Sequence, residues 1–371
     1  MREAGHGRAL AHGLPCEPQR LRRIWRQARD NRETRQIWCQ AVAEIARRSR
    51  IVGVTSIPVG QPVRIPLQLL APEYLPARDP RRRAWEAEQR ELVRFVEVVH
   101  AADLSGVHVI LDAGHGGQDT GAVVDGVWEA TYVYDILCRV KANLERHTQA
   151  TVWAVRKDTE VGFAAPARNV LEQDRDQILL THPPYHLQDS ILGVHLRWYL
   201  TNHIIARRLD RGVPRAKTVF LSVHADSLHP SVRGAMVYVP ARHLRPDRYA
   251  PQLEGLAAFA EVRENPTVVL SRNFRARAEA SSRRLADRIV AALRSDDLAV
   301  HPYEPVRDRV LRGQSTWVPA VLRYSLAQNA VLVECCNMAN DDDRALLLEQ
   351  EWRERFARAV VAGIAAAFSS E

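Results

Sequence analysis

From about residue 105 onward, short apolar runs rich in β-branched residues alternate with longer amphipathic stretches, and this alternation limits the fold more than any other feature. The runs that predict strands lie near residues 107–112, 151–156, 218–223, 234–239 and 329–334. Helical spacing of apolar residues predicts helices at residues 129–146, 276–294 and 350–368. Strands that alternate with helices favour an α/β domain with a central, mixed and mostly parallel sheet flanked by helices.

The last predicted helix carries a continuous apolar stripe. Its sequence, EWRERFARAVVAGIAAAF, places Trp352, Phe356, Val360 and Ile364 at intervals of four residues. Side chains at this spacing lie one above the other on one face of a helix. We therefore expect this face to be part of the core.

Two long stretches interrupt the alternation, residues 159–205 and 241–270. Connections of this length are uncommon inside compact domains and often cover functional sites. We interpret both stretches as insertions over one edge of the sheet, within a domain that covers residues 105–371.

The N-terminal part differs in composition from the rest. Residues 1–100 are rich in arginine and glutamate and contain a helical pattern at residues 33–48. A proline-rich stretch follows at 57–83, and its phrase VGQPVRIP, around residues 58–65, resembles the closing strand of LysM-type cell-wall-binding modules. We interpret residues 1–100 as a smaller accessory region of helical and β character, which serves as a cell-wall-binding segment or a linker.

Composition argues against several classes of protein. The formal net charge of +8 favours anionic partners, but the N-terminal arginines alternate with acids and lack an aromatic platform, so no nucleic acid is expected. Five cysteines without a C-x-x-C pair argue against a disulfide scaffold and a thiolate zinc site. No apolar run reaches the roughly 18 residues that a transmembrane segment needs, and no signal peptide is visible at the start.

Polar residues follow three of the predicted strands. His115 follows the strand VHVILD among glycines, His224 ends the run TVFLSV, and Glu334 ends the run AVLV. Glu129 opens the helix that comes after the first of these strands. Because α/β folds bind their ligands at the carboxyl ends of the strands, we expect these side chains to converge there.

Two imidazoles and a carboxylate around an open position form the ligand set of a catalytic zinc site. Each residue alone also has a simpler interpretation, Glu129 as a helix cap favoured by the helix dipole and His224 as a hydrogen-bonded structural residue. A carboxylate on a buried strand, as at Glu334, is costly unless it is paired, hydrogen-bonded or facing a metal ion. The residues by themselves predict zinc and leave the roles of the two glutamates open.

The order and spacing of these residues closely resemble those of the zinc-dependent N-acetylmuramoyl-L-alanine amidases, cell-wall amidases with a type 3 catalytic domain. The resemblance rests on VILDAGHGGQDTGA, Glu129, FLSVHADS with RGAMVYV, and the run AVLVE, and it covers roughly residues 105–368. The segment VRKD at residues 155–158, and Arg197 followed by Asn202, reproduce lesser landmarks of the family.

The resemblance implies that one Zn²⁺ ion binds His115, Glu129 and His224. It also implies that Glu334 is the catalytic carboxylate in hydrolysis of the amide bond between N-acetylmuramic acid and L-alanine in peptidoglycan, the reaction of an autolysin. Asp119 is expected either to hold the free ring nitrogen of His115 or to stabilise the turn.

Three positions depart from the family pattern. Ala113 stands where proline is usual, Asp226 stands where asparagine is common, and ECCNMAN replaces a more apolar turn after Glu334. None of these departures removes an expected ligand. The altered turn is nevertheless the support for one alternative, a catalytically inactive peptidoglycan-binding protein.

A second alternative is a zinc peptidase of related fold, which uses similar ligands and a similar glutamate. The expected substrate, peptidoglycan, predicts a periplasmic or extracellular location at the cell wall. A regulatory protein is expected as a further partner if the insertions cover the site. The sequence does not indicate an oligomeric state.

Overall fold

The computed structural model describes residues 42–52, 61–70, 72–95, 99–312 and 315–369. These residues fall into two compact units. One unit ends at Arg94 and includes Leu311–Ser315, and the other covers Phe95–Val310 and Thr316–Glu371.

Up to Arg94, the described part of the first unit is helical where it is regular. It contains a helix at residues 42–49, the 3-10 helices η2 (Leu67–Leu69) and η3 (Pro72–Tyr74), and α3 (Pro80–Val93). The start of α3 follows from sequence, because the Asp79 side chain accepts a hydrogen bond from Arg81 N at 2.9 Å and Pro80 takes the first helical position.

Two expectations for this N-terminal region fall largely outside the described residues. The predicted helix at 33–48 is described only from residue 42, where it is helical. The LysM-like phrase is described only from residue 61, and residues 61–66 form neither helix nor strand. Its role stays a prediction.

The second unit is built on a six-stranded sheet with the order β11-β8-β14-β7-β1-β4. The strands are β1 (His108–Ala113), β4 (Thr151–Ala154), β7 (Thr218–Asp226), β8 (Met236–Tyr238), β11 (Val306–Arg307) and β14 (Asn329–Asn337). Strands β4, β1, β7 and β14 run parallel to one another, β8 is antiparallel to β14, and β11 is parallel to β8. The expected mixed, mostly parallel sheet is therefore confirmed.

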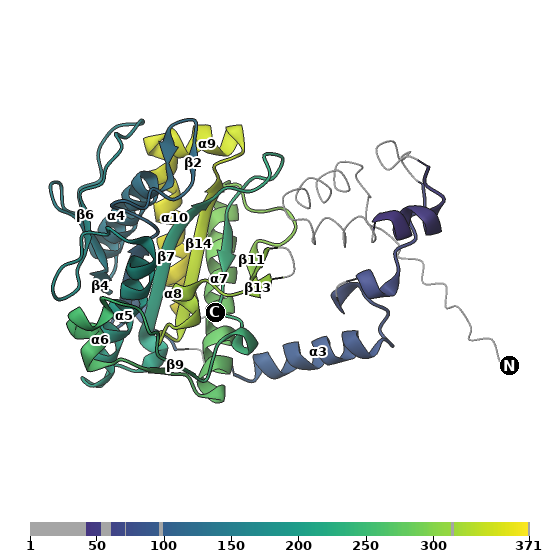
Figure 1. The fold of residues 1–371 in the computed structure, drawn as a ribbon, viewed down its shortest axis with the longest axis horizontal. Coiled ribbons are helices and arrows are strands. Elements are labelled where there is room, and N and C mark those ends of the chain that lie inside the picture. Colours follow the sequence, from purple (N-terminus) through teal and green to yellow (C-terminus); the bar gives the residue numbers. More distant parts are fainter. Residues whose placement is uncertain (1–41, 53–60, 71, 96–98, 313–314, 370–371) are drawn as a thin grey trace. The chain divides into compact units, whose positions relative to one another are not determined.

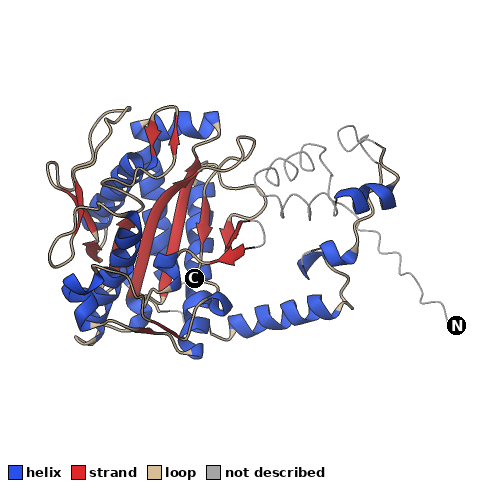
Figure 2. Cartoon of the chain, viewed as in Figure 1, coloured by secondary structure: helices blue, strands red, loops and turns tan. Residues whose placement is uncertain are grey.

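Helices cover both faces of this sheet (Figure 1, Figure 2). The main helices are α4 (Glu129–His147), α5 (Ser190–Leu209), α7 (Arg272–Ser295), α8 (Ala320–Arg323), α9 (Asp341–Leu348) and α10 (Gln350–Phe368). Alternate residues of each strand point to opposite faces. On β1, Val109 and Leu111 pack in the cluster that contains α4, α7 and α10, whereas Ile110 packs in the cluster that contains α5 and α8.

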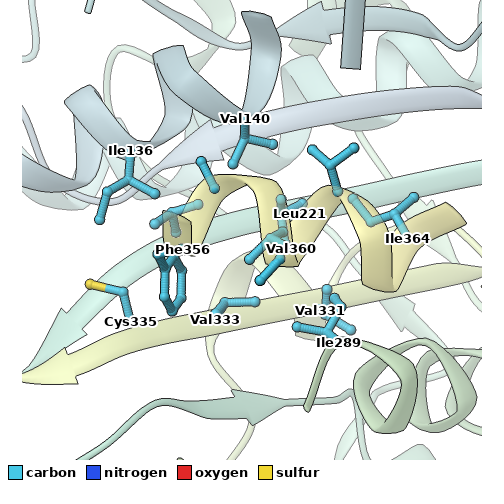
Figure 3. Close-up of a cluster of buried hydrophobic side chains, with 14 of the residues drawn as sticks. Ile136, Val140, Leu221, Ile289, Val331, Val333, Cys335, Phe356, Val360 and Ile364 are labelled. Atoms are coloured by element: carbon cyan, nitrogen blue, oxygen red, sulfur yellow. The ribbon is translucent and has the colours of Figure 1, made fainter. Parts of the chain in front are cut away.

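The apolar stripe of α10 lies in the core, as expected. Figure 3 shows Phe356, Val360 and Ile364 against Val331 and Val333 of β14. Phe356 has no solvent-exposed surface. Burying a side chain of this size contributes roughly 1.5–3 kcal/mol to folding.

The remaining described elements are short. They are β2 (Val123–Val124), β3 (Val127–Trp128), β5 (Arg156–Asp158), β6 (Gln177–Leu179), β9 (Arg248–Tyr249), β10 (Val268–Val269), β12 (Val310–Arg312), β13 (Ser315–Trp317), α6 (Ala260–Glu264), η4 (Ala102–Leu104), η5 (Arg215–Lys217), η6 (Arg242–Leu244) and η7 (Leu256–Ala258). Strands β2 and β3 form a hairpin that leads directly into α4. This hairpin fixes where Glu129 begins the helix.

The stretch 159–205, which we interpreted as an insertion, differs from that expectation in its second half. Residues from Ser190 onward form α5, a main helix whose Leu200 and Ile205 pack against the sheet. The stretch 241–270 contains several short elements, and its Leu256 and Phe259 pack with residues of α5. Among the described residues, no helix is both long and apolar enough to cross a membrane.

Candidate active site

Three neighbouring strands bring the predicted site residues to one edge of the sheet. Strands β1, β7 and β14 are parallel, so their carboxyl ends lie together. His115 follows the end of β1, His224 lies near the end of β7, and Glu334 lies on β14. In the register of β14 and β7, Glu334 is the partner of His224.

The turn after β1 requires glycine at position 114, where the backbone comes close to the His224 ring. A Cβ atom on Gly114 would lie 2.1 Å from Cε1 of His224, closer than side-chain atoms can come. The His115 backbone itself takes the left-handed conformation, with φ of +63°. A residue other than glycine rarely adopts this conformation unless neighbouring contacts hold it.

The side chains of His115, Glu129 and His224 form a compact cluster, each offering one ligand atom within 4.8 Å of the others. Glu129 Oε1 lies 3.2 Å from His115 Nε2 and 3.1 Å from His224 Nδ1. The two imidazole rings are nearly perpendicular, with an interplanar angle of 80°. Two ligands bound about 2.0–2.1 Å from one tetrahedral zinc ion lie roughly 3.3 Å apart, so the donor set and its spacing fit such an ion.

Backbone groups fix the carboxylate of Glu129. Ala122 N donates to its Oε2 at 2.9 Å and Ala225 N donates to its Oε1 at 3.0 Å. Burial raises the pKa of Glu129, but hydrogen bonds from His115 and His224 outweigh burial and hold the pKa well below its usual range. Glu129 is therefore an anion between two imidazoles.

Asp119 stabilises the turn after β1 and lies close to the second ring nitrogen of His115. Its Oδ1 lies 3.0 Å from His115 Nδ1 and also accepts a hydrogen bond from Gly121 N at 3.1 Å. Burial lowers the pKa of His115, but Asp119 and Glu129 outweigh burial and raise the pKa to about 9. A carboxylate on the second ring nitrogen orients the imidazole and leaves Nε2 directed at the cluster.

Two buried arginines hold the backbone that carries His115, and sequence reasoning did not identify this role. Arg197 donates to Ala113 O at 2.5 Å and to His115 O, and it pairs with Asp112 at 2.5 Å. Arg156 donates to Gly114 O at 3.1 Å and also to His115 O. Both arginines belong to motifs that the sequence singled out, but the partners lie more than 40 residues away.

Asn202 has a separate structural role. Its Nδ2 donates to Tyr324 O at 2.8 Å, and its Oδ1 accepts from Leu326 N at 2.7 Å. These bonds fix the turn that precedes β14. Asn202 therefore positions the strand that carries Glu334.

The Glu334 side chain carries a buried oxygen, Oε2, without a hydrogen-bond partner among the described residues. Burial, followed by repulsion from Asp226 and Glu129, raises its pKa well above the usual range. A buried carboxyl oxygen without a hydrogen-bond partner is costly and rare in folded proteins. Its position beside the His–Glu–His cluster suits a group that exchanges protons with a reactant.

These features together define a class of protein. An α/β domain with two imidazoles and a carboxylate at the carboxyl ends of its strands, and a second carboxyl group beside them, has the arrangement of a metal-dependent hydrolase.

The family follows from comparison with known proteins. A family model described as N-acetylmuramoyl-L-alanine amidase matches residues 109–366. The chain therefore belongs to the N-acetylmuramoyl-L-alanine amidase family and to this class of cell-wall hydrolases. No curated protein matches the chain.

The solved structures to which the chain is similar include amidases from other organisms. The N-acetylmuramyl-L-alanine amidase Ami1 from Mycobacterium smegmatis is 20% identical, with a TM-score of 0.43 and coverage of 71% of this chain and 98% of its own. AmiC2 of Nostoc punctiforme is 23% identical, with a TM-score of 0.39 and coverage of 70% and 96%. CwlD from Clostridioides difficile, solved in complex with the GerS lipoprotein, is 16% identical, with a TM-score of 0.40 and coverage of 70% and 98%.

Proposed function

We propose that this chain hydrolyses the amide bond between the lactyl group of N-acetylmuramic acid and L-alanine of the peptidoglycan stem peptide. In this proposal His115, Glu129 and His224 hold one Zn²⁺ ion, and Glu334 is the catalytic carboxylate. The observation that carries the proposal is the cluster of three ligand atoms within 4.8 Å, with Glu334 as the register partner of His224.

A metal of this kind suits the residues and the reaction. When bound, zinc lowers the pKa of water from 15.7 toward about 7 and polarises an amide carbonyl. The donors are two nitrogens and one oxygen, without a thiolate, which is typical of catalytic rather than structural zinc sites. Asp119 and the backbone amides of Ala122 and Ala225 hold these donors in place.

Glu334 carries the proton in this mechanism. It accepts the proton of the attacking water and delivers it to the alanine nitrogen, which cannot leave as an anion. The raised pKa of Glu334, caused first by burial and then by Asp226 and Glu129, allows the group to hold a proton between the two transfers. Its Oε2 has no partner among the described residues that competes for that proton.

The test is digestion of purified peptidoglycan by the wild-type protein and by the Glu334→Gln variant, with and without a chelator, followed by mass analysis of the fragments. The wild-type protein with zinc should release stem peptides that begin with L-alanine. Chelator should abolish release, and zinc should restore it. Glu145→Gln, which changes a half-exposed acid on α4, is the matched control and should remain active.

The same fragments separate the alternatives. A zinc peptidase of related fold cuts between amino acids and leaves the muramic acid amide intact. A catalytically inactive binding protein releases no fragment under any condition. Either result would overturn the proposed reaction.

The proposed substrate places the protein in the periplasm or outside the cell, at the cell wall. We also propose that the described residues of the catalytic unit leave the site open, because the His115 and His224 side chains are 26% and 19% exposed. We propose that residues 1–100 are an accessory region and that residues 105–371 are the catalytic domain.

A further inference from the structure

A polar cavity lies beside the start of α4. It has a volume of about 320 Å³ and is lined by Thr131, Tyr134, Asp135 and residues of the segment 158–177. This segment connects β5 to β6, next to α4 in Figure 1. The proposed amidase mechanism uses no residue of this cavity.

Several carboxylates that line the cavity form no close ion pair among the described residues. Asp158, Glu160, Asp174 and Asp176 all line it, and none forms an ion pair with another described residue. Its two arginines have other partners, since Arg168 pairs with Glu172 at 3.1 Å and Arg175 contacts the Gln118 side chain and the Trp128 ring. Buried Arg156 is a further cation that acts on Asp174.

Two neutral side chains that line the same cavity also carry buried oxygen atoms without partners. Thr131 and Gln177 both line the cavity and are 8% and 1% exposed. Thr131 Oγ1 and Gln177 Oε1 are buried and have no hydrogen-bond partner among the described residues. Buried oxygens of this kind are normally satisfied, so each one indicates a missing partner.

The two least exposed of these carboxyl groups, those of Asp158 and Asp174, lie close to each other. Asp158 is 2% exposed, and its carboxyl group lies within hydrogen-bonding reach of Asp174. Burial, and then the hydrogen bond with Asp174, raises the pKa of Asp158 to about 6. Two carboxylates that share a proton can instead share a metal ion, which compensates both charges.

We propose that this cavity is a binding site for a hard divalent cation, Ca²⁺, held by Asp158, Asp174 and Thr131. The donors are all oxygens, which Ca²⁺ prefers, and the cavity leaves room for the waters that complete its six to eight ligands. Without nitrogen or sulfur donors, the cavity is a poor match for zinc. The bound ion ties the segment 158–177 to the first turns of the helix that begins with Glu129.

The test is calorimetric titration of Ca²⁺ into the zinc-loaded full chain, together with thermal unfolding at increasing Ca²⁺ concentration. Wild-type protein should bind one Ca²⁺ and unfold at a higher temperature. Asp174→Asn should weaken Ca²⁺ binding by about tenfold or more, because affinity follows the number of charged ligands. Asp341→Asn changes an exposed carboxylate outside the cavity and should bind Ca²⁺ as the wild type does.

A second variant keeps the test decisive if Asp174→Asn fails to fold. Asp174 also accepts hydrogen bonds from Asp176 N and the Gln177 side chain, so its loss disturbs the segment itself. Thr131→Val removes only one oxygen and keeps the shape of the side chain, and it should also weaken Ca²⁺ binding. The proposal is overturned if wild-type protein shows no Ca²⁺ response at millimolar concentration, or if Thr131→Val binds Ca²⁺ unchanged.

Discussion

Glu334 and His224 are register partners on β14 and β7, two parallel strands whose carboxyl ends lie together. The arrangement places a carboxyl group with a raised pKa beside a proposed metal ligand, the rise being caused by burial and by repulsion from neighbouring acids. Glu334→Gln should lower kcat by about 10²–10⁴-fold, the usual contribution of a positioned acid or base. Zinc content should stay at the wild-type level. Initial rates on a soluble muramyl peptide check the prediction, and wild-type turnover would contradict it.

Zinc binding should release a proton from His115. In the metal-free protein Asp119 and Glu129 outweigh burial and raise the pKa of His115 to about 9, so the ring is protonated at neutral pH. Because a metal ligand must be deprotonated, apparent zinc affinity should rise about tenfold per pH unit up to pH 9. Calorimetry in buffers of different ionisation enthalpy measures the released proton. Asp119→Asn should reduce that release, and equal release in both proteins would contradict the assignment.

The same group affects the stability of the metal-free protein. The folded pKa of about 9 lies above the ordinary value of 6.5, so protonated His115 stabilises the folded state. This contribution is complete below pH 6.5 and is lost as pH rises through about 9. Chemical denaturation of chelated protein at several pH values should show the loss, and His115→Gln should remove it.

Gly114→Ala should disrupt zinc binding through a steric clash with His224. The added Cβ would lie 2.1 Å from the imidazole, so the ring must move away from the cluster. Gly126→Ala is the control on the neighbouring hairpin, where a Cβ meets no atom within 4 Å and only backbone strain of about 1 kcal/mol remains. Zinc affinity of the two variants separates the effects. Wild-type affinity in Gly114→Ala would show that His224 can move without loss of the ion.

Arg197→Lys should weaken zinc binding although Arg197 is not a proposed ligand. Lysine cannot reach Asp112, Ala113 O and His115 O together, so the turn that carries His115 loses its support. Partners that orient a ligand typically contribute 10–100-fold to metal affinity, and we expect a loss of about that size. Arg139→Lys is the matched control, because Arg139 is also buried but pairs with Asp135 and Glu354. Arg139→Lys should lower stability and leave zinc affinity unchanged.

The sheet and the polar edge could be predicted from the sequence because both follow from short-range patterns. A run such as VHVILD identifies a buried strand, and a polar residue directly after it must lie at the carboxyl end. The neighbouring positions of β1, β7 and β14 in the sheet, which the structure supplies, then bring His115, His224 and Glu334 to one edge. The helix α10 was predicted with its observed bounds because one face alone is apolar enough to pack.

Helix α5 was missed because it is covered on two sides. Leu200 and Ile205 face the sheet, whereas Leu196 and Trp198 pack with the segment 241–270. Buried residues therefore follow one another without the interval of three or four that identifies a surface helix. The role of Arg156 and Arg197 in holding the His115 backbone was missed for a different reason. Their contacts join distant parts of the chain and leave no local pattern.

The most direct test of the proposed metal site is the zinc content of the purified His224→Ala variant, measured per chain by mass spectrometry beside the wild-type protein and Glu334→Gln. We predict one zinc ion per chain in the wild type and in Glu334→Gln, and a large loss in His224→Ala that excess zinc restores only in part. Full zinc occupancy in a folded His224→Ala protein would contradict the proposal that His115, Glu129 and His224 hold the ion.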